Sequence, residues 1–312
     1  MLLETVALKK NLPLDTLTYI DSSMLSTFRA CRKKFYWNYV QKLRPAGQSI
    51  HLLAGGAFAA GLEQARLYQF RDHKDGPAHL DDLCHAAMRG FARAWTSDSE
   101  FEHETKNFHN TFHALEAYLA EYPPFSDPVQ PFMKPDGSPA TEFTFAIPLP
   151  VNNPAGTPWM FVGRFDLLGY YGPLMVVQDE KTTSALGPYW LRQWDLRGQF
   201  LGYTWACRQL GYPVDHCIVR GIAIQKTMHQ FASVPVNYTN TLVDRWYATL
   251  LDTLHEINHF FEIDQWSYNF GDACSSYGGC GYSDLCKASD PELFLTNYEH
   301  NEWNPVTADQ GG

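Results

Sequence analysis

The stretch Gly163-Arg-Phe-Asp166-Leu-Leu-Gly-Tyr-Tyr-Gly-Pro-Leu-Met-Val-Val-Gln-Asp179-Glu180-Lys181-Thr182-Thr183 decides the fold. Its two apolar runs flank Gly172-Pro173, which predicts a β-hairpin that turns at this pair. In a symmetric hairpin centred there, Asp166 faces Asp179 across the two strands. Facing residues have Cβ atoms about 4.5–5.5 Å apart. The hairpin therefore predicts two adjacent carboxylates.

Lys181 follows Asp179 by two positions, so both side chains lie on one face of the strand. Glu180 points to the other face, although its backbone carbonyl stays near the pair. Two close carboxylates raise each other's pKa unless a cation lies between them. Mg²⁺ or Mn²⁺ with hard oxygen ligands meets that need and can activate a phosphodiester and water. The alternative is an ordinary hairpin with polar residues on its solvated face.

The remaining periodicity predicts an α/β core that follows a helical lead. We expect helices from Asp21 to Pro45 and at about 54–70, 80–96, 108–121, 189–210 and 240–262. We expect strands at about 142–149, 159–170, 174–181 and 215–225. The domain prediction is one unit over residues 1–312, with residues 71–125 as a helical insertion.

Composition excludes several classes of protein. Apolar residues make up 45% and charged residues 19% of the 312 residues, which is enough for a core. No apolar run is long enough for a membrane span, and Met1–Lys10 carries no secretory signal, so we expect a cytoplasmic protein, in the host cytoplasm if it is viral. The net charge of −10 excludes a uniformly basic nucleic-acid coat. Residues 1–50 nevertheless carry eight basic and three acidic side chains, which suits contact with a polyanion at one place, or simply a solvated helix face.

The chain has seven cysteines, an odd number that argues against a disulfide framework in a cytosolic protein. Three of them, Cys274, Cys280 and Cys286, are evenly spaced in a glycine-rich tail. Thiolates of this kind suit an iron–sulfur cluster or Zn²⁺, and spacing does not separate the two. Cys84, Cys207 and Cys217 lie in apolar periodic segments and are expected in the core.

The ordered set Gly163-x-x-Asp166, Asp179-x-Lys181-Thr182 and Gln199-x-x-x-Tyr203 resembles the PD-(D/E)XK nuclease superfamily in its RecB-like branch. This resemblance implies a restriction-endonuclease-like mixed central sheet flanked by helices. It implies catalysis by Asp166, Asp179 and Lys181, with the Glu180 carbonyl as a further metal ligand. Gln199 and Tyr203 project from one helix face and would contact bound DNA. For Tyr203, plain amphipathicity is the alternative.

One motif of that branch is degraded in this sequence. The pattern Gly-x-x-x-His-x-x-Leu usually supplies a metal-binding histidine, but Gly55 to Leu62 carries Ala59 at that position. Glu63 lies one turn later on the same face and is the first candidate to replace the histidine. Glu142, on the strand before the hairpin, is the second.

The cysteines extend the resemblance to iron–sulfur exonucleases of the CRISPR-adaptation type. These proteins hold a [4Fe–4S] cluster with one N-terminal and three C-terminal cysteines. By that resemblance, the ligands here are Cys31, Cys274, Cys280 and Cys286, which would clasp residue 31 to residues 270–290. The first tail gap is longer than the family's usual one, and Zn²⁺ stays an alternative. Arg32, Lys33 and Lys34 flank Cys31 beside aromatic residues and are expected to line the DNA path.

Together these features predict a metal-dependent DNA exonuclease acting in recombination, repair or phage DNA processing. We expect DNA ends or single strands as partners, protein partners in recombination, and no membrane. No Walker A motif is present, so a built-in helicase motor is excluded. The alternative function is a catalytically inactive nuclease-fold protein that binds DNA or supports assembly and is stabilised by a metal cluster. A Zn²⁺-stapled protein of unrelated function is a third possibility.

Overall fold

A computed structural model describes residues 17–47, 49–96, 103–275 and 279–301. The chain divides into two compact units, which we describe separately. The first unit contains Met1–Gly47, Phe145–Gly163 and Asp244–Gly311, and the second contains Gln48–Thr144 and Arg164–Val243. No helix in the described ranges is long and apolar enough to cross a bilayer.

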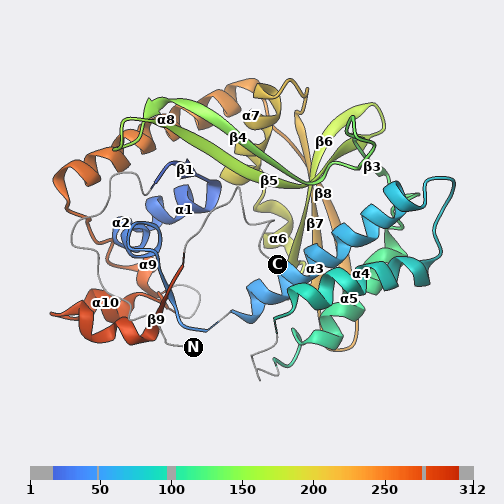
Figure 1. The fold of residues 1–312 in the computed structure, drawn as a ribbon, viewed down its shortest axis with the longest axis horizontal. Coiled ribbons are helices and arrows are strands. Elements are labelled where there is room, and N and C mark those ends of the chain that lie inside the picture. Colours follow the sequence, from blue (N-terminus) through green and yellow to red (C-terminus); the bar gives the residue numbers. More distant parts are fainter. Residues whose placement is uncertain (1–16, 48, 97–102, 276–278, 302–312) are drawn as a thin grey trace. The chain divides into compact units, whose positions relative to one another are not determined.

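A mixed β-sheet is the main β element of the fold (Figure 1). Its central strands follow the order β5-β6-β7-β8, with β5–β6 and β7–β8 antiparallel and β6–β7 parallel. Strands β1, β3 and β4 each pair with β5. The bounds are β1 Tyr19–Ile20, β3 Val129–Pro131, β4 Thr141–Asn152, β5 Pro158–Tyr171, β6 Leu174–Thr183, β7 His216–Ile224 and β8 His229–Asn237. The predicted mixed sheet flanked by helices is confirmed.

The hairpin of β5 and β6 has the register that the sequence predicts. Tyr171 pairs with Leu174 next to the turn, and the pairing continues in step to Leu167 and Gln178. Gly172 has φ +57°, and two-residue hairpin turns favour glycine at such a position. Asp166 and Asp179 come next in this register, one position beyond the Leu167–Gln178 pair.

Three helices of the second unit, α3 (Ile50–Leu67), α4 (Leu80–Ala94) and α5 (Phe108–Glu121), lie side by side (Figure 1). A π-helical turn, Tyr68–Asp72, extends α3. Their apolar faces share one core with Ile222 and Ile224 of β7. The helices therefore cover the face of the sheet on which the even-numbered side chains of β7 lie. The predicted boundary of a helical insertion at 71–125 stays a prediction.

Two predictions in the second unit are wrong. The helix expected over 189–210 is two helices, α6 (Pro188–Arg192) and α7 (Gly198–Gln209). Between them, the Trp194 carbonyl accepts hydrogen bonds from the Arg197 amide and from the Tyr238 hydroxyl, at 3.1 and 2.7 Å. A distant tyrosine thus stabilises a turn that local periodicity does not reveal. Strand β8 was also missed, because it is largely solvent-accessible and lacks a strong apolar alternation.

The first unit contains α1 (Ser22–Ala30), α2 (Arg32–Phe35) and a π-helical turn at Tyr36–Val40. The single helix expected from Asp21 to Pro45 is therefore wrong, because Cys31 is extended, with φ −164° and ψ 117°. The remaining elements are β2 (Leu43–Pro45), paired with β9 (Tyr298–His300), α8 (Asn240–Ile263, which begins in the second unit), α9 (Asp272–Ser275), α10 (Ser283–Lys287) and a 3₁₀ segment at Pro291–Asn297. A small core brings residues 37–43 together with residues 282–298; it consists of Trp37, Leu43, Tyr282, Leu285, Leu295 and Tyr298.

Candidate active site and cysteine pocket

Two acidic side chains meet at the end of the hairpin, as the sequence predicts. Asp179 is 1% exposed, and Asp166 accepts a 2.8 Å hydrogen bond from the Glu180 amide to its Oδ2. Burial raises the pKa of Asp166 well above its usual range, and repulsion from Asp179 and Glu142 raises it further. Burial also raises the pKa of Asp179. The site therefore carries more negative charge than the positively charged residues within it neutralise.

Lys181 supplies the ammonium group of this cluster. Its Nζ forms an ion pair with Asp179 Oδ2, and its side chain is 32% exposed. Burial lowers the pKa of Lys181, but attraction from Asp179 and Asp166 outweighs this effect, and the net shift is upward. Lys181 is therefore a cation held beside two carboxylates.

Glu142 joins the cluster from the first residues of β4. Its backbone has φ +48°, a left-handed conformation that is uncommon for a residue with a side chain. Its Oε2 lies 2.7 Å from Arg164 Nε. Burial raises the pKa of Glu142 to about 7, against the attraction of Arg164 and with added repulsion from Glu63. Glu63 on α3 therefore acts on the cluster through Glu142.

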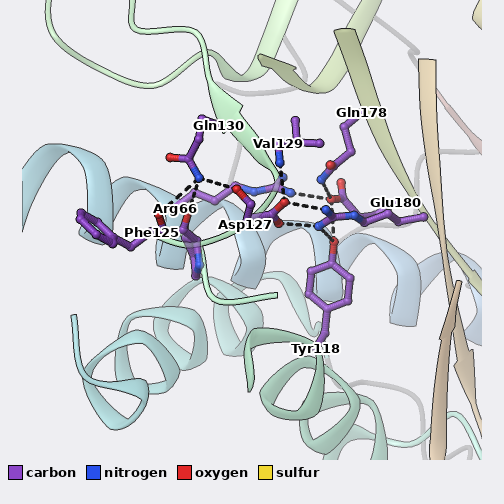
Figure 2. A network of polar contacts seen from close by, with 10 residues as sticks. Arg66, Tyr118, Phe125, Asp127, Val129, Gln130, Gln178 and Glu180 are labelled. Carbon is purple, nitrogen blue, oxygen red and sulfur yellow. Dashed lines mark hydrogen bonds and ion pairs between the residues drawn. The ribbon is translucent and has the colours of Figure 1, made fainter. Parts of the chain in front are cut away.

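The Glu180 side chain lies on the opposite face of β6, as predicted, and is held in a buried polar network (Figure 2). Its Oε1 receives hydrogen bonds from Arg66 Nη2 at 2.5 Å, Gln178 Nε2 at 2.6 Å and the Tyr118 hydroxyl at 3.0 Å. Its side chain is 4% exposed. This carboxylate is therefore committed to a structural ion pair, and only the Glu180 backbone faces the acid cluster.

The network continues from Tyr118 into a second buried ion pair. Arg220 Nη1 and Nη2 donate to both carboxylate oxygens of Asp127, at 2.5 and 2.6 Å, and Nη1 also lies 3.1 Å from the Tyr118 hydroxyl. Gln130 holds the loop by donating to the Asp127 carbonyl at 2.6 Å (Figure 2). Arg220 pairs with Glu180 in the β6–β7 register, so both side chains lie on the same face. The network therefore stabilises the face of β6 that is opposite to Asp179.

Sequence reasoning missed Arg66, Asp127 and Arg220. The signal for Arg220 was present, since a single arginine interrupts an otherwise apolar strand, and a buried charge needs a partner. From the sequence alone, neither Asp127, in a polar loop, nor Arg66, on an apolar helix, could be assigned to this buried network. The pairing joins segments that are 93 residues apart in the chain.

Gln199 and Tyr203 lie on α7 and contact β6 and β5. Gln199 Nε2 donates to Asp179 Oδ1 at 3.2 Å and to the Tyr203 hydroxyl at 3.0 Å. The Tyr203 hydroxyl donates to the Arg164 carbonyl at 2.7 Å. Tyr203 is 7% exposed. In this arrangement, both side chains orient Asp179 and β5, and their predicted contact with DNA stays a prediction.

The four cysteines of the predicted cluster line one pocket in the first unit. Cys31 is buried, Cys280 and Cys286 are half-buried, and Cys274 is exposed. Tyr268, Phe270, Tyr282 and Lys34 line the same pocket. Burial raises the pKa of Cys286, with further repulsion from Cys280 and Cys31. The extended backbone at Cys31, which interrupts the first helix, belongs to this pocket.

The predicted DNA-binding cations near Cys31 have contacts within the first unit. Arg32 Nε and Nη2 donate to Glu256 Oε1 at 3.0 and 2.6 Å. Lys33 Nζ lies 4.3 and 4.5 Å from the ring centroids of Tyr36 and Trp37, and burial lowers its pKa. Lys34 lines the cysteine pocket. These contacts give the basic segment a structural role, and its DNA path stays a prediction.

Neither site is a finished metal centre. Over the ranges that the structure describes, no group of three or more His, Cys, Asp and Glu side chains is arranged to hold a metal ion. The donor chemistry nevertheless fits two different ions. Mutually repelling buried carboxylates suit a hard divalent cation, and four thiols around one pocket suit iron–sulfur or zinc.

Comparison with known proteins gives a family but no curated relative. The family model of the PD-(D/E)XK nuclease superfamily matches residues 22–287. No curated protein matches the chain. Solved structures that resemble it include a candidate exonuclease from Eubacterium rectale (14% identity, 83% of this chain, 88% of that chain, TM-score 0.47) and SSO0001 (12% identity, 78% of this chain, 98% of that chain, TM-score 0.32).

The family match spans the acid cluster, Lys181, the Gln199 helix and all four cysteines that line the pocket. The match therefore covers the motifs whose order along the chain predicts this superfamily. The chain belongs to the PD-(D/E)XK nuclease superfamily.

Proposed function

We propose that the protein is a divalent-metal-dependent DNA exonuclease of the RecB-like branch. The observation that carries this proposal is the acid cluster of Asp166 and Asp179 beside Lys181. Burial raises the pKa of both carboxyl groups, and repulsion from Asp179 raises the pKa of Asp166 further, so a cation that enters the site stabilises their charged forms.

Asp166, Asp179 and the Glu180 carbonyl would hold Mg²⁺ or Mn²⁺, and Glu142 or Glu63 would complete the set. The ion, when bound, supplies Lewis-acid activation of the phosphodiester and of water. Glu142 is the stronger of the two candidates, because it repels Asp166 directly whereas Glu63 acts on Glu142. Gln199 orients Asp179 by its 3.2 Å hydrogen bond.

Lys181 takes the role of electrostatic partner to the scissile phosphate. Its ammonium group is held next to Asp179. In that position, it can orient the attacking water and offset the charge that develops on the phosphoryl oxygens. Because its pKa is raised, it stays protonated at neutral pH and acts as a charge rather than as a base.

Activity is tested with end-labelled single- and double-stranded DNA in Mg²⁺ or Mn²⁺. We expect the wild type to release nucleotides from an end, and Asp179→Ala to abolish release while the circular dichroism spectrum is unchanged. Asp82→Ala, which removes an exposed carboxylate on α4, is the matched control and should remain active. Full activity of Asp179→Ala would contradict the assignment.

The second candidate function is a nuclease-fold protein that binds DNA without cutting it. Ala59, at the position of the usual histidine ligand, favours this alternative. It predicts DNA binding by the wild type with no metal-dependent cleavage of any end-labelled substrate. Restored cleavage in Ala59→His would then indicate a site that lost one ligand.

We also propose that Cys31, Cys274, Cys280 and Cys286 ligate a [4Fe–4S] cluster that clasps the first helix to the tail. The shared pocket supports this proposal, and Zn²⁺ is the alternative occupant. Anaerobically purified protein should contain iron and acid-labile sulfide. Cys286→Ser should lose both, whereas Cys84→Ser, outside the pocket, should keep them. Stoichiometric zinc without iron in the wild type would decide for the alternative.

A further inference from the structure

The segment between the catalytic strand β6 and helix α7 exposes large apolar side chains. Tyr189 is 78% exposed, Leu196 75% and Leu191 41%. They lie within eight consecutive residues and belong wholly to the second unit. Such a concentration of exposed apolar surface marks an interaction site more often than a solvated loop.

Buried side chains anchor this segment. Trp190 and Trp194 are 7% and 4% exposed, and their rings meet edge to face at 5.0 Å. The Tyr238 hydroxyl donates to the Trp194 carbonyl at 2.7 Å, and Trp194 also contacts Phe200 at 5.8 Å. Two buried tryptophans therefore anchor the segment that carries Tyr189 and Leu196.

The segment and the helix that follows it contact the acid cluster or its strand neighbours. A Cβ atom on Gly221 would lie 2.4 Å from the Trp190 ring, so that ring occupies the space a side chain would need. Gly221 pairs with Lys181 in the parallel register, so its missing side chain would share the face of Lys181. In the helix that follows, Gln199 donates to Asp179. The segment that carries the exposed side chains thus packs against the strand next to Lys181 and leads into the helix that contacts Asp179.

Cations accompany the apolar side chains. Arg192 and Arg197 are exposed on the same segment, next to a single acid, Asp195. The chain as a whole carries a net charge of −10, so this local combination departs from its surroundings. Aromatic and arginine side chains together form the usual support for single-stranded nucleic acid, with stacked bases and paired phosphates.

We propose that Tyr189, Leu191, Arg192, Leu196 and Arg197 form a platform that binds unpaired bases of single-stranded DNA next to the scissile phosphate. This inference rests on the proposed nuclease function and names how the substrate is held. An exposed tyrosine ring can stack on a base only when that base is outside a duplex. The platform therefore selects a single strand, or a frayed end, for the acid cluster.

The test is fluorescence anisotropy with a short labelled single-stranded oligonucleotide, in EDTA so that no cleavage occurs. We expect Tyr189→Ala to weaken binding roughly tenfold or more, because one stacked base contributes about that factor. Tyr171→Ala is the matched control, since it removes a 51% exposed tyrosine at the hairpin turn, remote from Asp179 along β6. It should bind as the wild type does.

An oligonucleotide of the same length with abasic sites separates stacking from general loss of affinity. On that ligand, Tyr189→Ala and the wild type should bind equally, while Arg192→Ala should still be weaker than the wild type. Equal binding of Tyr189→Ala and wild type to the normal oligonucleotide would overturn the platform, as would an equal loss on both oligonucleotides. Cleavage is measured separately: a wild type that binds through Tyr189 but never cuts contradicts the nuclease function alone.

Discussion

Removing the Asp127 carboxylate should destabilise the second unit by about 3–5 kcal/mol, because it leaves the Arg220 guanidinium buried without its counter-ion. Arg220 is 2% exposed and makes two hydrogen bonds to Asp127, at 2.5 and 2.6 Å. The variant is Asp127→Ala. We expect cooperative unfolding at a clearly lower denaturant concentration.

Arg220 keeps two other contacts in this variant. The Tyr118 hydroxyl lies 3.1 Å from Arg220 Nη1, and the Tyr122 ring centroid lies 4.0 Å from the guanidinium carbon. Neither carries a negative charge, so neither replaces the carboxylate. The Val129 amide also loses its 2.8 Å hydrogen bond to Asp127 Oδ1, which adds about 1 kcal/mol. A loss of about 3–5 kcal/mol is a large part of the roughly 5–15 kcal/mol that holds a protein folded.

The assay is urea unfolding followed by tryptophan fluorescence. Asp215→Ala is the matched control, because it breaks the ion pair of Arg208 with Asp215, whose side chain is 58% exposed. Exposed pairs contribute about 0–1 kcal/mol, so that variant should unfold close to the wild type. Asp127→Ala combined with Arg220→Met should recover part of the loss, since a buried apolar side chain needs no counter-ion. If Asp127→Ala is no less stable than Asp215→Ala, the reasoning about a buried pair is refuted.

Three further predictions concern the acid cluster and the helix packing. Burial and repulsion raise the pKa of Glu142 to about 7, so between about pH 4.5 and 7 the metal-free folded state binds more protons than the unfolded state. The free energy of unfolding should therefore fall as the pH rises through this range. Glu142→Gln should flatten that slope by at most about 1.4 kcal/mol per pH unit, and an unchanged slope in urea titrations would contradict the shift. Mg²⁺ or Mn²⁺ should raise the thermal midpoint of the wild type but not that of Asp179→Ala; an equal rise in both would place the ion elsewhere. Gly90→Ala should destabilise the protein by about 1–3 kcal/mol or more, the range for overpacking, because the new Cβ would lie 2.3 Å from the Ala60 carbonyl oxygen. Gly56→Ala, with nothing within 4 Å of its Cβ, should instead stabilise the protein by about 0.5–1 kcal/mol. If calorimetry ranks the two variants the other way, α3 and α4 separate freely.

The local part of the fold could be predicted because it depends on short-range rules. A hairpin is set by its turn, and the two-residue period of a strand assigns each side chain to a face. Gly172-Pro173 therefore fixed which acids face each other, and the structure has that register. The family assignment depended on the same motifs in their order along the chain.

Other features depended on partners that are distant in sequence. Cys31 interrupts a stretch with helical periodicity, and Tyr238 stabilises the turn that ends α6. The back of the catalytic strand is fixed by Arg66 and by the Arg220–Asp127 pair, which no local pattern predicts.

The amino-acid sequence by itself determined the hairpin, the adjacent acids, the lysine beside them and the superfamily, since each follows from spacing along one or two strands. Only the tertiary structure decided which side chains neutralise the charges around that hairpin. It placed the Glu180 carboxylate in a buried ion pair with Arg66, Gln199 on Asp179, and the rings of Trp190 and Trp194 against each other. The physical reason is that burial makes an unpaired charge or polar group costly, and its partner can come from any part of the chain that folding brings near.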